Sequence, residues 1–78
     1  MSTEITAPIP GVFYRRPAPN KPPFVEAGDT VDAGQTIGVI EIMKQFTEVR
    51  SDVAGVLREF SIADNGMVGP GDIIAIID

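Results

Sequence analysis

TEVRSDVAGV, at residues 47–56, nearly repeats TEITAPIPGV at residues 3–12. The leading Thr-Glu and the closing Gly-Val recur 44 positions later, and the apolar Ile5 and Ile9 recur as Val49 and Val53. A second match, between TIGVIE at 36–41 and IIAIID at 73–78, has an offset of 37 positions. A chain that repeats itself once in this way predicts two similar half-units.

The two offsets differ by seven, so the first half carries seven extra residues between Gly11 and Val31. Four of the seven prolines fall in this interval, at positions 17, 19, 22 and 23. Because proline fixes the backbone and cannot donate to a sheet, we expect an inserted, stiffened loop at about residues 16–23.

The rest of the chain predicts an all-β barrel or sandwich. Short β-branched runs alternate with Gly, Asp, Asn and Pro, and no window shows a helical period. Gly28-Asp29 and Asn65-Gly66 predict turns, and the second pair is a strong hairpin signal. The expected strands lie near 3–7, 11–15, 36–42, 46–50, 55–62 and 73–77, with shorter extended pieces near 24–26, 30–32 and 67–68.

The repeat also predicts how the chain is organised. A length of 78 residues suits a single domain, residues 1–78, with half-units 3–41 and 47–78 packed face to face about a pseudo-two-fold axis. Residues 42–46 have no counterpart, because their partners would lie beyond Asp78. We therefore expect Lys44 to protrude at one end of the domain, opposite the two termini.

Composition excludes several classes of function. The net charge of −5 argues against a nucleic-acid partner and against binding to an anionic membrane. No apolar run is long enough to span a bilayer, and the polar first residues are not a secretory signal. The absence of cysteine excludes disulfides and fits a cytoplasmic location.

The chain is poorly equipped for catalysis. It has no His and no Cys, so it lacks the usual general base, thiol nucleophile and soft metal ligands. Asp29 and Asp32 do not form the oxygen-rich loop of a calcium site, and we interpret them as solvated turn residues. We expect no metal and no enzymatic activity of its own.

The junction of the two halves reads Ile42-Met43-Lys44-Gln45 and is unusual as a turn. Tight hairpin turns favour Gly, Asn or Asp, because they require positive φ, and none of these is present. The junction also exposes an apolar Met43, and Lys44 is one of only two lysines, the other being Lys21. A lysine in a turn is ordinarily a solvated surface residue, but a local breach of turn chemistry suggests a function.

Glu41-Ile42-Met43-Lys44 resembles the biotinylation signature Glu-Ala-Met-Lys, and the resemblance to the biotinyl domain extends over residues 6–78. It implies a flattened β-barrel, a barrel-sandwich hybrid of two pseudo-two-fold related four-stranded sheets, with biotin joined covalently to Lys44. Met43 and Glu41 would be recognition positions for a biotin protein ligase. Ile42 stands where the family usually has Ala, and Gln45 where it has Met or Leu, so ligation is expected to be slow or to need a dedicated ligase.

A second motif, Gly11-Val12-Phe13-Tyr14-Arg15 followed by Pro17 and Pro19, is similar to the Gly-x-Phe-Tyr-Arg-x-Pro-x-Pro stretch of acetyl-CoA carboxylase carriers. In that subfamily the stretch opens a protruding thumb that can touch the biotin. The predicted insertion lies at the same place. The resemblance therefore implies Arg15 and Arg16 as contacts for the cofactor, with ordinary surface charge as the alternative.

The resemblance implies a non-catalytic carrier, whose biotin moves from a biotin carboxylase to a carboxyltransferase that serves acetyl-CoA or a related acyl-CoA or organic acid. The partners would be these two enzymes and the ligase. The long N-terminal region and linker of acetyl-CoA carboxylase carriers do not precede the domain, so a stand-alone carrier and a fragment both remain open. Two alternatives are a lipoyl carrier, which usually has Asp-Lys-Ala at the turn, and a cofactor-free barrel-sandwich adaptor.

Overall fold

The computed structural model describes residues 1–78 and consists of strands, turns and loops without a helix. None of its elements is therefore a helix that could cross a membrane. The strands are β1 (Thr3–Thr6), β2 (Gly11–Tyr14), β3 (Thr30–Val31), β4 (Thr36–Ile42), β5 (Gln45–Arg50), β6 (Gly55–Phe60), β7 (Gly66–Val68) and β8 (Ile73–Ile77). The predicted all-β class is confirmed.

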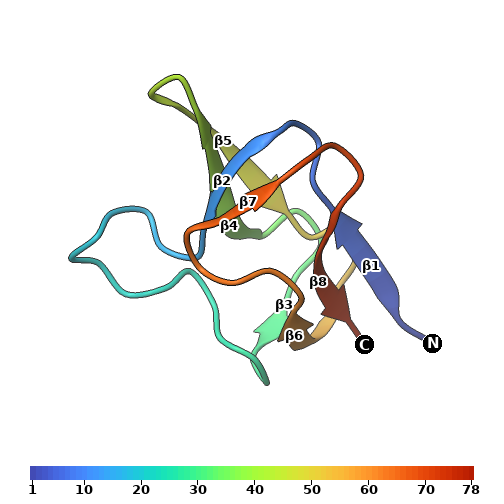
Figure 1. Cartoon of the computed structure of the whole chain (residues 1–78). Helices are drawn as coiled ribbons and strands as arrows, with labels where there is room; N and C mark the ends of the chain where they lie inside the picture. Colours follow the sequence, from blue (N-terminus) through green and yellow to red (C-terminus); the bar gives the residue numbers. More distant parts are fainter.

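Two four-stranded antiparallel sheets face each other, with strand orders β1-β8-β6-β3 and β5-β4-β2-β7 (Figure 1). Exchanging every strand with its repeat in the other half, so that β1 and β5 change places, as do β2 and β6, β3 and β7, and β4 and β8, converts one order into the other. The repeat in the sequence is thus a pseudo-two-fold relation in space, as predicted.

The half-units interlock, which differs from the simple face-to-face packing predicted from the repeat. Each sheet contains two strands from each half, so neither half forms a sheet alone. Twin hydrogen bonds join the halves: Gly34 N donates to Ser51 O at 2.7 Å, and Gly71 N donates to Ala7 O at 2.9 Å. Because each half leaves strand edges that only the other half can pair, the two must fold together.

Residues at equivalent positions of the two half-units form the core together. Phe13 and its repeat Leu57 are fully buried. Ile40 is fully buried as well, and its repeat Ile77 is 1% exposed. The complete cluster is Ile5, Ala7, Phe13, Val25, Val31, Ile37, Ile40, Val49, Leu57, Val68, Ile74, Ala75 and Ile77. Successive strand residues point to opposite faces, so the neighbours of these residues form the outer surface.

Two glycines allow the strands to approach closely at equivalent places. A side chain at Gly11 would collide with the carbonyl oxygen of Glu41, and one at Gly55 would collide with that of Asp78. The backbone at Gly11 also has φ of 151°, which disfavours an L side chain. These glycines explain why the Gly-Val pair is part of the repeat.

The β4–β5 turn projects from one end of the molecule, and both termini lie at the other end (Figure 1). This arrangement confirms the predicted position of the Lys44 turn. Residues 15–29, which include the predicted insertion, hold no strand and extend from the side of the barrel (Figure 1).

The extended piece predicted near 24–26 is not paired in a sheet, unlike those predicted near 30–32 and 67–68. Pro22 and Pro23 precede them and have no N–H to donate. The backbone hydrogen bond from Phe24 N to Arg15 O, at 2.9 Å, reaches only the start of the same loop. Val25 is nevertheless buried in the core, so the apolar pattern indicated burial rather than a strand.

Asn65-Gly66 forms a turn but not a hairpin, so that part of the prediction is wrong. Asn65 has φ of 69°, and Gly66 N donates to Ala63 O at 2.9 Å, as in a tight turn. The strands on either side, β6 and β7, belong to different sheets. Asn65 adopts the left-handed conformation that this turn requires. Gly28, which is the repeat of Asn65 in the first half, does the same with φ of 97°.

Candidate functional site

The turn between β4 and β5 has only two residues, Met43 and Lys44, because Ile42 pairs with Gln45. Both turn residues have positive φ, 53° for Met43 and 65° for Lys44, as a two-residue turn of the I′ kind requires. A residue with a side chain pays about 1–2 kcal/mol for this conformation. The turn is therefore strained at both positions, in agreement with the poor turn chemistry of the sequence.

The side chains at the turn are exposed to solvent. Lys44 and Gln45 are exposed, Met43 is 90% exposed, and Ile42 is 40% exposed. Lys44 belongs to none of the three ion pairs in the structure. Its amine is thus free and accessible to an enzyme that approaches along the axis of the hairpin.

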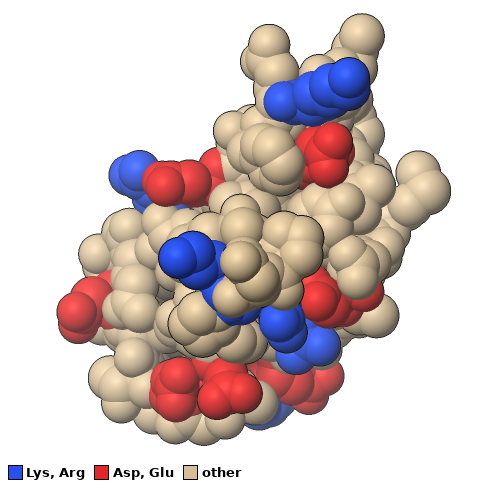
Figure 2. Space-filling view, turned by 90° about the vertical axis from the view of Figure 1, so that its left-hand side faces the viewer, with Lys and Arg blue, Asp and Glu red and all other residues tan.

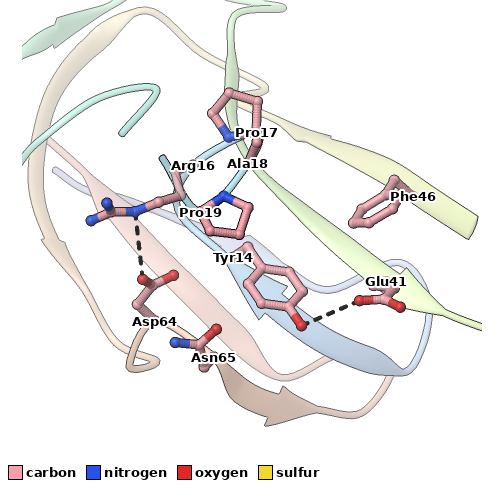
Figure 3. Close-up of a pocket in the computed structure, with 9 residues that line it drawn as sticks. All are labelled: Tyr14, Arg16, Pro17, Ala18, Pro19, Glu41, Phe46, Asp64 and Asn65. Atoms are coloured by element: carbon pink, nitrogen blue, oxygen red, sulfur yellow. Dashed lines mark hydrogen bonds and ion pairs between the residues drawn. The ribbon is translucent and has the colours of Figure 1, made fainter. Parts of the chain in front are cut away.

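A pocket of about 510 Å³ lies between the proline-rich loop and the outward face of the β5-β4-β2-β7 sheet (Figure 3). Glu41 and Phe46, one on each strand of the hairpin, pair across β4 and β5 and form one wall. The lining residues are Tyr14, Arg16, Pro17, Ala18, Pro19, Glu41, Phe46, Asp64 and Asn65. The pocket is therefore continuous with the strands that carry the turn.

Glu41 is held at this wall by Tyr14. The Tyr14 hydroxyl donates a hydrogen bond of 3.2 Å to Oε1 of Glu41 (Figure 3). The pKa of Tyr14 is raised, first by loss of solvent and then by its hydrogen bond to the Glu41 carboxylate. The hydroxyl therefore keeps its proton and remains a donor throughout the neutral range.

The two arginines predicted from the thumb motif lie differently. Arg16 lines the pocket, with Nε 3.9 Å from Oδ2 of Asp64 and Nη1 donating to Lys21 O at 3.5 Å (Figure 3). Its Nε is buried and makes no hydrogen bond. Arg15 is not a lining residue, because its guanidinium lies over the ring of Phe60, 5.2 Å from the ring centre. Of the two arginines, only Arg16 lines the pocket, with a guanidinium nitrogen that makes no hydrogen bond.

The structure thus brings Glu41, Ile42, Met43, Lys44 and Gln45 together on one hairpin, with Arg16 across the pocket and Arg15 turned towards Phe60. The sequence did not predict Phe46, Asp64 or Asn65 as site residues, and it pointed to Tyr14 only as part of a motif. Phe46 had a local signal, since it is an aromatic residue two positions after Lys44. Asp64 and Asn65 had none, because the fold alone brings them beside Tyr14. Nowhere do three or more His, Cys, Asp or Glu side chains group in a way that could hold a metal ion.

Comparisons with known proteins agree with this geometry. The chain is 44% identical over 63 residues to a biotin carboxyl carrier protein of acetyl-CoA carboxylase from Nostoc, an alignment that covers 81% of this chain and 34% of the relative. The carrier of the same name from Porphyra purpurea is 32% identical over 74 residues, covering 95% of this chain and 47% of the relative. The chain thus spans less than half the length of both relatives.

Solved structures show the same architecture. A segment of the urea carboxylase of Kluyveromyces lactis matches all of this chain with a TM-score of 0.81 and 26% identity, and that segment is 6% of the larger protein. A single-chain, multi-domain long-chain acyl-CoA carboxylase matches 96% of the chain with a TM-score of 0.79 and 19% identity, which shows the shared fold. The family model described as "Biotin-requiring enzyme" matches residues 3–77. The chain therefore belongs to the biotin/lipoyl attachment family.

Proposed function

We propose that this chain is a biotin carboxyl carrier, with biotin joined as an amide to Nζ of Lys44. The observation that carries the proposal is the position of Lys44, exposed and without an ion pair at the apex of a strained two-residue turn. Support comes from the family match and from relatives that are named as carriers of acetyl-CoA carboxylase. Acetyl-CoA is accordingly the first acceptor to test, before other acyl-CoA or organic acids.

The barrel would act as a rigid support for the attached biotin. Amide formation would remove the positive charge of Lys44, so the modified tip would no longer be attracted to acidic surfaces. The biotin would supply a ring that accepts and gives up a carboxylate group. The barrel would supply position and a high effective concentration at each partner, so contacts with those partners can be weak. No catalytic group of this chain is needed.

We also propose that the pocket beside the hairpin receives the ring of the cofactor between visits to the two enzymes. Pro17, Pro19 and Phe46 offer apolar surface, and Arg16 Nε, which lies 3.9 Å from Oδ2 of Asp64, makes no hydrogen bond. A cyclic urea has a carbonyl acceptor that suits this donor, and its N–H groups suit a carboxylate such as Glu41. These groups fit a cyclic urea, and because Arg16 lines the pocket and Arg15 does not, we propose this role for Arg16.

The partners would be a biotin protein ligase, a biotin carboxylase and a carboxyltransferase, and the place of action the cytoplasm. A lipoyl carrier is the main alternative, because the family includes both attachments. Met43, immediately before Lys44, favours biotin, since lipoyl domains usually have Asp at that position. A cofactor-free adaptor would leave the strained, exposed turn without a purpose.

The test is the intact mass of the chain after incubation with a biotin protein ligase, ATP and biotin, followed by peptide mapping. We expect one biotin per chain on Lys44, its absence in Lys44→Arg, and unchanged labelling in Lys21→Arg, because Lys21 lies in the proline-rich loop. Modification of Lys21, or attachment of lipoate but not biotin by the matching ligases, would contradict the proposal.

A further inference from the structure

The pocket beside the hairpin carries a net negative charge. Its charged lining residues are Arg16, Glu41 and Asp64, and the two carboxylates lie to either side of Tyr14 (Figure 3). Asp64 and Arg16 offset each other, because Nε of Arg16 lies 3.9 Å from Oδ2 of Asp64. Glu41 belongs to none of the three ion pairs and accepts its hydrogen bond from the neutral hydroxyl of Tyr14. Its charge is therefore held at the pocket wall without a cation.

The other half of the barrel shows that the fold does not impose this unpaired charge. The repeat of Glu41 is Asp78, and the repeat of Tyr14 is Arg58. Arg58 donates to both carboxylate oxygens of Asp78, at 2.6 and 2.9 Å, so that carboxylate is neutralised. The same pair of positions can therefore hold an ion pair, and at the pocket it holds a carboxylate and a phenol instead.

Attachment of biotin would leave Glu41 with even less positive charge nearby. On the face that carries the proline-rich loop, a basic group crosses the projecting end of the molecule and an acidic group lies just below it (Figure 2). Lys44 is the basic residue of the turn, three positions after Glu41, and an amide at its Nζ has no charge. The other cation of the hairpin, Arg50, is already paired with Glu48 at 2.6 Å. Glu41 would then have no free cation on its own hairpin.

The charge of the attached group would change as the carrier works. The unloaded ring is a neutral cyclic urea, whose N–H groups can donate to Glu41. A biotin carboxylase would replace the proton of one ring nitrogen by a carboxylate taken from bicarbonate, with release of that proton and conversion of ATP to ADP and phosphate. The exchange removes a donor and adds a negative charge. A carboxylate in the pocket would also lose water beside Pro17, Pro19 and Phe46, whose side chains offer it no hydrogen bond.

We infer that the pocket holds the ring while it is uncharged and that Glu41 expels the carboxylated ring. The inference rests on the proposed function. A group can shift an equilibrium only by its different affinities for the two states, and here the difference is the repulsion between like charges. The loaded ring is then free to reach the carboxyltransferase, and the unloaded ring is held at the barrel when it returns. The barrel itself need not change shape.

The test is NMR spectroscopy of the biotinylated chain with isotope-labelled biotin, before and after carboxylation by a biotin carboxylase with ATP and bicarbonate. Contacts between the ring protons and Phe46 measure the ratio of docked to free ring. We expect this ratio to fall about tenfold on carboxylation, as for two like charges within one pocket at a protein surface. The methyl ester of the carboxylated ring has nearly the same size and no charge, so it should stay docked. Release of the ester as well would show that size drives release, and would overturn the inference.

Two substitutions remove the unpaired charge in different ways. Glu41→Gln removes the carboxylate, whereas Tyr14→Arg copies Arg58 and gives Glu41 an ion pair without altering the hairpin. With the biotinylated fraction of each variant purified first, we expect carboxylation to lower the docked ratio about threefold or less. Glu48→Gln is the matched control and should behave as the wild type, because Glu48 is paired with Arg50 and does not line the pocket. Rising salt should also retain the carboxylated ring in the wild type.

Capture of the carboxylate by Arg16 is the opposite outcome. The carboxylated ring would then dock more tightly than the unloaded ring, Arg16→Gln would abolish the gain, and the inference would be overturned. It is also overturned if the wild type, Glu41→Gln and Tyr14→Arg release the ring equally, or if the ring is free in both states of the wild type. In each of these cases biotin on Lys44 still supports the proposed function. A chain that a biotin protein ligase leaves unmodified at Lys44 would remove the proposed function, and the inference with it.

Discussion

Tyr14 on β2 donates its hydroxyl proton to Glu41 on β4, across 27 positions of the chain and a distance of 3.2 Å. The bond joins the motif that precedes the proline-rich loop to the motif that contains Lys44. Two motifs that are far apart in the sequence are therefore parts of one site.

This bond predicts that Tyr14 loses its proton at a higher pH than an ordinary tyrosine. Because loss of solvent and the Glu41 carboxylate both raise its pKa, the neutral phenol is favoured in the folded protein. The resulting stability is fully present below the ordinary tyrosine pKa of about 10 and is lost as the pH rises through the higher pKa of the folded state. Tyr14 is the only tyrosine and the chain has no tryptophan, so ultraviolet absorbance follows it alone. A midpoint at or below that of the chain unfolded in urea would contradict the bond.

The strained turn predicts that Met43→Gly stabilises the domain. Glycine accepts positive φ without a steric cost, and this relief exceeds the extra flexibility that glycine gives to the unfolded chain. We expect a gain of roughly 0.5–1 kcal/mol in the free energy of unfolding, measured by urea denaturation. Gln45→Gly is the control, because Gln45 is in a strand and should be destabilised by the same substitution. Equal losses in both variants would show that the turn is not strained.

The close approach at Gly11 predicts a large loss of stability in Gly11→Ala. The new methyl group would overlap the Glu41 carbonyl and the Ile40 side chain, in a backbone conformation that already disfavours it. We expect the free energy of unfolding to fall by about 1–3 kcal/mol, and by a similar amount in the twin variant Gly55→Ala. At Gly69 the nearest atom is a flexible carboxylate oxygen 3.7 Å away, so Gly69→Ala should have little effect. Thermal melting of the three variants checks the order.

The pocket predicts different outcomes for the two arginines of the loop. With biotin attached, Arg16→Gln should increase the mobility of the cofactor ring, because the guanidinium Nε at the pocket is lost, whereas Arg15→Gln should not. Arg15→Gln should instead reduce thermal stability slightly, through loss of its contact with Phe60. Protection of the ring protons in NMR spectra, compared with free biotin, measures the first effect. An equal response in both variants would remove the proposed role of Arg16.

The sequence predicted the fold well because the fold is a repeat. Matching glycines and apolar positions located the strands and the pseudo-two-fold axis, and the lack of a counterpart for residues 42–46 located the tip. The errors occurred where local chemistry and tertiary pairing disagree. Asn65-Gly66 has the residues of a hairpin but leads into the other sheet, while Met43-Lys44 lacks those residues and forms the tight hairpin turn.

The site was predictable at the hairpin and much less so around the pocket. Lys44 and its neighbours are contiguous in sequence, so one motif contains them. Asp64 and Asn65 come from the loop between β6 and β7 and reach the pocket only through the pairing of β7 with β2. The different directions of Arg15 and Arg16 depend on Phe60 and Asp64, which no local pattern connects to them.

The most direct test of biotin attachment to Lys44 is the mass of this protein purified from the cells that make it, with the modified residue located by peptide mapping. We predict one biotin on Lys44 and an unmodified Lys21. A lipoyl group on Lys44, or a chain that carries no group at all when its cells contain biotin and an active ligase, would contradict it.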